Sequence, residues 1–63
     1  MTSANWDILW YKSVAAMDDC EEEGSATAID EGHAMRIADE MYDQTYCVEV
    51  FRHGELWVRW EAK

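Results

Sequence analysis

The fold is decided by residues 46–61, which read YCVEVFRHGELWVRWE. Both halves of this stretch are rich in β-branched and aromatic residues, which favour strands, and they flank His53-Gly54, where glycine can supply the positive φ of a tight turn. We therefore predict an antiparallel hairpin made of residues 46–52 and 55–61. A two-residue turn would pair Arg52 with Glu55, Phe51 with Leu56, Val50 with Trp57 and Val48 with Arg59.

This register gives the hairpin two unlike faces. The predicted core face holds Cys47, Phe51, Leu56, Val58 and Trp60, with Glu49 as the exception. The other face mixes apolar with charged side chains and is expected to be half exposed; it holds Tyr46, Val48, Val50, Trp57, Arg52, Arg59, Glu55 and Glu61. An isolated hairpin is marginally stable in water, so another strand or a helix must pack against it.

The residues before the hairpin predict a helix over 27–43. Its apolar residues recur at spacings of three and four, as on one side of a helix: Ala34, Ile37, Ala38 and Met41. Thr27 followed by Asp30 resembles a capping box, with Asp in place of Glu, and would mark the start of this helix.

The first third of the chain is compatible with two structures. Trp6, Ile8 and Trp10 alternate with Asp7, as in a strand, but the apolar residues between 6 and 20 also fall at helical spacing. Aromatic density favours a strand over 6–12, and residues 14–17 favour a helix after it. Residues 18–25 then form either a charged turn or a short acidic helix that Gly24 closes.

Together these elements predict a single α+β domain covering residues 1–63, with no internal repeat and no linker. The domain would consist of an N-terminal aromatic strand, an acidic helix and a C-terminal antiparallel hairpin. The alternative is two helices followed by the hairpin.

The charge is concentrated in the middle of the chain. Fourteen acids and five bases give a net charge of −9. Ten of the acids lie between residues 18 and 43, where Arg36 is the only base, so this segment carries the whole excess. The last turn of the predicted helix is acidic, although the helix dipole disfavours anions there. Local departures from the rules of stability often mark function, so these acids are functional candidates.

The composition excludes several classes of protein. A net charge of −9 repels the phosphates of nucleic acids, so we expect no direct binding to DNA or RNA. No apolar run approaches the roughly 20 residues of a membrane span, and residues 1–5 carry no secretory signal, so we expect a cytoplasmic protein without membrane contact. Cys20 and Cys47 are then expected to be reduced, and the alternative is a single disulfide between them.

Catalytic and cofactor sites are not expected. Cys20, His33, Cys47 and His53 lack the paired spacing of a zinc site, and the acidic runs lack the alternating ligands of a calcium loop. A chain of 63 residues offers little room for the cleft that an acid–base pair needs. We therefore predict no enzymatic activity, no cofactor and no metal.

The function predicted from the charge is mimicry of nucleic acid. Carboxylates three and four residues apart on a helix lie about 5–6 Å from one another, close enough to a track of phosphates to engage the same arginines and lysines. The candidate binding residues are Asp18, Asp19, Glu21, Glu22, Glu23, Asp30, Glu31, Asp39, Glu40 and Asp43. Four tryptophans exceed what so small a core needs, so Trp10 or Trp57 is a candidate exposed anchor.

A small acidic, tryptophan-rich, proline-free chain with its charge in one segment resembles the DNA-mimic anti-CRISPR proteins, phage-encoded inhibitors of type I target-recognition complexes. The layout of the chain is also similar to that of small phage inhibitors of host RNA polymerase. It has a strand, then an acidic helix that opens with Thr27-Ala28-Ile29-Asp30-Glu31, and then a hairpin. The resemblance covers the whole chain in composition and layout. It implies that the acids of 18–43 occupy the site, on the large subunit of a CRISPR effector, that reads the protospacer-adjacent motif.

The alternative function belongs to a different class. An interaction or regulatory adaptor, such as an antitoxin or a polymerase-binding protein, would bind through the aromatic hairpin, and the acidity would serve solubility alone.

Overall fold

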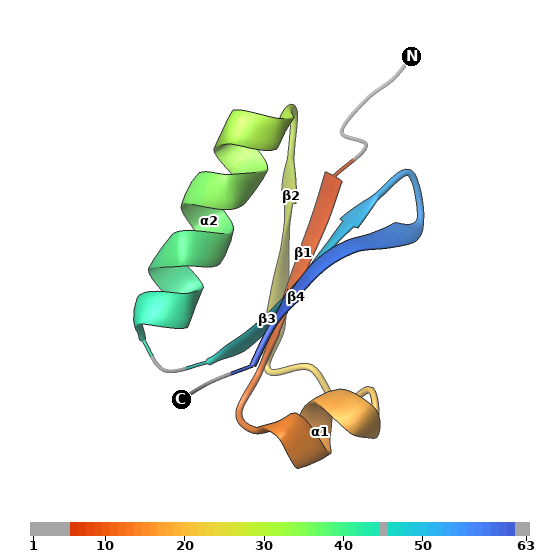
Figure 1. Ribbon diagram of the computed structural model, residues 1–63, viewed down its shortest axis with the longest axis vertical. Helices are drawn as coiled ribbons and strands as arrows, with labels where there is room; N and C mark the ends of the chain where they lie inside the picture. Colours follow the sequence, from red (N-terminus) through yellow and green to blue (C-terminus); the bar gives the residue numbers. More distant parts are fainter. Residues whose placement is uncertain (1–5, 45, 62–63) are drawn as a thin grey trace.

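The computed structural model describes residues 6–44 and 46–61 and has an α+β fold, as predicted. Its elements in chain order are β1 (Trp6–Tyr11), α1 (Val14–Asp18), β2 (Gly24–Ala28), α2 (Glu31–Asp43), β3 (Cys47–Arg52) and β4 (Glu55–Trp60). The four strands form one antiparallel sheet in the order β2-β1-β3-β4. Helix α2 covers one face of the sheet, and the short α1 lies at one end of the other face (Figure 1).

The first third of the chain is a strand followed by a helix. Residues 6–11 form β1, which confirms the strand interpretation over the helical one. The side chain of Ser13 caps α1, because its Oγ accepts a hydrogen bond from the backbone N–H of Ala16 at 3.1 Å. The chain then turns at Cys20, whose φ is +58°, before it enters β2.

Strand β2 was not expected from the sequence. Gly24 does not close a helix; it opens this strand, which pairs with β1 from Trp10↔Gly24 to Trp6↔Ala28. Thr27 therefore lies in a strand, and the predicted start of the helix is wrong. Helix α2 begins at Glu31 and is capped by Asp30, whose Oδ1 accepts the N–H of His33 at 2.8 Å.

The hairpin of β3 and β4 is confirmed, but its register changes at a bulge. Arg52↔Glu55 and Phe51↔Leu56 pair as predicted. Trp57 is then an extra residue, so Val50 pairs with Val58 and Val48 with Trp60 instead of with Trp57 and Arg59. A one-residue slip moves every later side chain to the opposite face.

The bulge also corrects the predicted core face. Val48 and Val50 are fully buried on the same side as Val58 and Trp60, whereas Leu56 is 51% exposed. The main core lies between α2 and the sheet. It is built from Trp6, Ile8, Ala28, Ala34, Ala38, Val48 and Val50, with Trp10, Ile37, Met41, Tyr42, Tyr46, Val58 and Trp60 packed around them.

A second, smaller core lies on the opposite face of the sheet, beneath α1. Tyr11, Met17 and Cys47 are buried there. The hydroxyl of Tyr11 donates a hydrogen bond to Oε1 of Glu49 at 2.8 Å, which accounts for an acid among apolar neighbours. Burial, together with this carboxylate, raises the pKa of Tyr11 above its ordinary value.

Candidate functional site

The structure divides the ten candidate acids into three groups. Asp18, Asp19 and Glu21–Glu23 lie at the end of α1 and in the segment that leads to β2. Asp30 and Glu31 lie at the start of α2. Asp39, Glu40 and Asp43 lie in its C-terminal half. Because α1 and α2 are on opposite faces of the sheet, the first and third groups do not form one continuous surface (Figure 1).

The third group, Asp39, Glu40 and Asp43, forms what we call the acidic helix face. All three side chains are exposed, and Asp43 follows Glu40 by three residues and Asp39 by four on one helix. No basic residue lies in the last turn of α2. The carboxylates therefore sit beside the negative end of the helix dipole, an arrangement that does not favour the stability of the helix.

A small hollow adjoins the acidic helix face. It has a volume of about 230 Å³ and is lined by Asp39, Tyr42 and Trp60. The rings of Tyr42 and Trp60 lie 5.5 Å apart with their planes tilted by 57°. A carboxylate beside two aromatic rings suits a guanidinium group, which forms ion pairs and also stacks on aromatic faces.

The first group is partly neutralised within the molecule. Oδ1 of Asp18 lies 3.1 Å from a guanidinium nitrogen of Arg59, and that nitrogen lies 3.5 Å from Oε2 of Glu61. The hydrogen bond to Asp18 raises the pKa of Arg59. Lys12 approaches Glu23 at 3.8 Å. The acids of this group without an ion pair to another described residue are Asp19, Glu21 and Glu22.

The second group has a structural explanation. Asp30 is the N-cap of α2, and Glu31 lies in the first turn, where the helix dipole favours a negative charge. These two residues therefore do not need a partner to account for their presence.

The two candidate tryptophan anchors differ in exposure. Trp10 is half-buried against the main core and packs over Gly24, so its role is structural. Trp57 is 42% exposed, and its ring meets that of Trp6 edge to face with centroids 5.1 Å apart. With Leu56 beside it, Trp57 forms an exposed apolar patch on the outer strand β4. Trp57 is the extra residue of the bulge.

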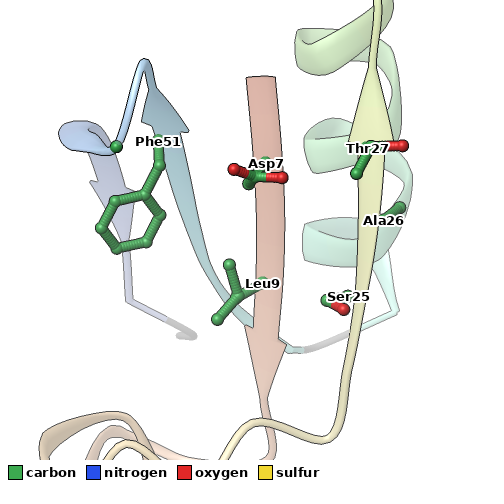
Figure 2. A pocket seen from close by; sticks show the side chains of 7 residues that line it. Asp7, Leu9, Ser25, Ala26, Thr27 and Phe51 are labelled. Atoms are coloured by element: carbon green, nitrogen blue, oxygen red, sulfur yellow. The ribbon is translucent and has the colours of Figure 1, made fainter. Parts of the chain in front are cut away.

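A hollow on the face of the sheet opposite α2 was not predicted from the sequence. It has a volume of about 540 Å³, and Asp7, Leu9 and Phe51 line it together with Ser25 and Thr27 of β2 (Figure 2). The alternation of residues in β1 could have indicated two of its lining residues. Because Trp6 and Ile8 are buried on one face of the sheet, Asp7 and Leu9 must point to the other face.

Reactive and metal-binding groups do not gather in the part of the chain that the structure describes. Among residues 6–44 and 46–61, no three His, Cys, Asp or Glu side chains are placed to hold a metal ion. Cys20 is an exposed free thiol and Cys47 a buried one. No described helix is long and apolar enough to cross a membrane.

The chain matches no protein-family model, no curated protein and no solved structure.

Proposed function

We propose that the protein is a non-enzymatic inhibitor that mimics nucleic acid and blocks the DNA-binding site of a host defence complex. The acidic helix face, Asp39, Glu40 and Asp43, is the surface that binds. The proposal agrees with the resemblance to anti-CRISPR proteins, in which the blocked site is the one that reads the protospacer-adjacent motif.

The observation that carries the proposal is a cluster of three exposed acids at the helix end where the dipole disfavours them. The Cβ atom of Asp43 is about 5–6 Å from those of Asp39 and Glu40, close enough to a track of phosphates for these acids to engage the same arginines and lysines. A basic groove that binds phosphates therefore also attracts this face. The hollow beside Asp39 adds a place where an arginine of that groove can stack on Tyr42 and Trp60.

The test is competition for DNA. The purified chain is added to a type I target-recognition complex bound to its duplex, and displacement of the duplex is measured at several salt concentrations. We expect displacement that weakens with salt, because the contact is electrostatic. The variant Asp39→Asn, Glu40→Gln, Asp43→Asn should lose at least about tenfold in potency.

A matched control comes from the other face of the sheet. Asp19→Asn, Glu21→Gln, Glu22→Gln removes the same net charge but leaves the acidic helix face intact. It should retain most of the potency. Equal loss of potency in the two variants would mean that displacement depends on net charge and not on the acidic helix face. If the unaltered chain displaced no duplex, the proposal would be rejected.

The exposed pair Leu56 and Trp57 favours a second candidate function. An adaptor of the antitoxin or polymerase-binding kind would use this apolar patch, since exposed tryptophans are frequent anchors of protein interfaces. Trp57→Ala should then abolish partner binding, while the acidic helix variant leaves it unchanged. If the protein is a nucleic-acid mimic, the acidic helix variant should lose binding and Trp57→Ala should keep it.

A further inference from the structure

Strand β2 is an edge of the sheet, and its outer side is unpaired among the residues that the structure describes. It pairs with β1 on one side, and no other described strand pairs with it. Helix α2 packs on one face of the sheet and contacts β2 less than it contacts β3 and β1. Alternate backbone N–H and C=O groups along an edge strand point away from the sheet and can bind another strand.

Charged side chains, proline and a bulge, three of the usual protections of an edge strand, are absent from β2. Its residues, Gly24–Ala28, include no charged side chain, and the chain has no proline. The pairing with β1 runs without a bulge from Trp10↔Gly24 to Trp6↔Ala28. The opposite edge differs, because β4 carries Glu55, Arg59 and the bulge at Trp57. Charges and bulges of that kind hinder pairing with a further strand.

The charges around β2 indicate which charge pattern a segment that pairs with it should have. Residues 24–29 are six uncharged residues within a segment that is otherwise strongly acidic. Glu21–Glu23 precede this neutral window, and Asp30–Glu31 follow it. Ile29, at the end of the window, is 76% exposed and offers an apolar contact. At about 3.4 Å per residue the window spans roughly 20 Å, with carboxylates at both ends.

We propose that the outer edge of β2 binds an extended segment of a partner protein by strand addition, and that this segment has about six uncharged residues between basic ends. Backbone hydrogen bonds to β2 would supply the affinity, and the flanking carboxylates would select the basic ends. A second copy of this chain is the poorer occupant, because antiparallel pairing of two β2 edges would bring the acids of two molecules of charge −9 together. The inference does not depend on the proposed function, since it concerns a different surface.

The probe is a peptide with a lysine at each end and six alternating threonine and valine residues between them. The alternation and the lysine ends are kept when the sequence is reversed, so such a peptide can add to β2 in either orientation. Amide hydrogen exchange of the full chain with and without the peptide should reveal new protection in Gly24–Ala28 and none in Glu55–Trp60. Protection confined to β4, or no change in β2 at saturating peptide, would overturn the proposal.

Backbone methylation of the peptide tests for strand addition directly. Two versions are made, one N-methylated at every second residue and one at every residue. A strand has two hydrogen-bonding edges, and methylation of every second residue blocks only one of them, so the first version should still bind through its free edge and the second should not bind. Binding of the fully methylated peptide, or loss of binding by the half-methylated one, would mean that the peptide does not bind as a strand.

Charge selection is tested on the protein and on the peptide. Glu21→Lys, Glu22→Lys should weaken binding by about tenfold, whereas Asp39→Lys, Glu40→Lys, with the same change of net charge on α2, should weaken it much less. A peptide with glutamate ends should not bind. If that peptide bound equally well, or if the chain formed dimers that protected β2, the proposed occupant would be wrong. Loss of DNA competition by the acidic helix variant, measured separately, leaves this result untouched.

Discussion

The indole of Trp10 lies directly over Gly24, so that a Cβ placed on this glycine would come within 2.7 Å of ring atom Cζ2. The two residues are paired across β1 and β2. The ring covers backbone that no side chain of β2 shields, and the absence of a side chain at Gly24 is what allows the ring to lie there. This contact joins the edge strand to the main core.

Gly24→Ala should therefore destabilise the fold by about 1–3 kcal/mol, because the ring or the strand must move. Gly32→Ala is the matched control. Its new Cβ would meet only Oδ1 of Asp30, at 3.6 Å, and alanine is the better helix former by up to about 1 kcal/mol. Urea denaturation of both variants measures the difference. Equal midpoints for the two would show that Trp10 does not occupy the space above Gly24.

The capping residue of α2 can be identified by substitution. Asp30→Ala removes the acceptor of the His33 N–H and should cost about 0.5–2 kcal/mol in the free energy of unfolding. Thr27→Val keeps the β-branched side chain in β2 and should change that free energy by less than about 0.5 kcal/mol. If Thr27 acted as the cap, as the sequence suggested, the larger effect would follow the second substitution.

The acids at the end of α2 should act against stability. Asp43→Lys places a cation where the helix dipole favours one and should raise the free energy of unfolding by about 0.3–1 kcal/mol. Glu31→Lys, in the first turn, should lower it. Thermal melts at low salt show whether each substitution stabilises or destabilises the protein, and added salt should reduce both changes in stability. A stabilised Asp43→Lys variant with reduced DNA competition would mean that this acid serves binding at the expense of stability.

The Tyr11–Glu49 hydrogen bond predicts how stability depends on alkaline pH. The pKa of Tyr11 is raised in the folded protein above the 10.0 of the free side chain, so the folded state holds the proton more tightly than the unfolded state. The resulting stabilisation is complete below pH 10 and is lost as the pH rises through the folded pKa. Tyr11→Phe should remove this dependence and lower the stability at neutral pH. Denaturation of both proteins across the alkaline range, with ultraviolet absorbance following the phenolate, tests it.

Some elements could be predicted because their signals are local. The turn at His53-Gly54 and the two pairs next to it follow from adjacent residues, and both His53 and Gly54 have positive φ. The aromatic alternation of β1 and the spacing of Ala34 and Ala38 likewise reflect one element burying one face. Fold class was therefore accessible from the residues alone.

Other elements escaped prediction because their cause is not local. Gly24–Ala28 contains few strand-forming residues and forms β2 because β1 pairs with it and Trp10 covers its glycine. The bulge at Trp57 brings Val58 and Trp60 onto the face of Val48 and Val50, so that α2 can cover all four. Strand β2 and the bulge at Trp57 both depend on which strands pair and which side chains are buried together. Neither feature can therefore be predicted from a single segment of the sequence.

The sequence by itself determined the charge of the middle segment, the hairpin turn and the α+β class, since composition and short-range periodicity encode them. Only the tertiary structure decided which acids share a surface. The sheet lies between α1 and α2, because Tyr11 and Cys47 point to one face and Trp10 and Val48 to the other. That alternation places the acids of α1 and those of α2 on opposite faces of the sheet. The strand order makes β2 an edge that no other described strand than β1 pairs with.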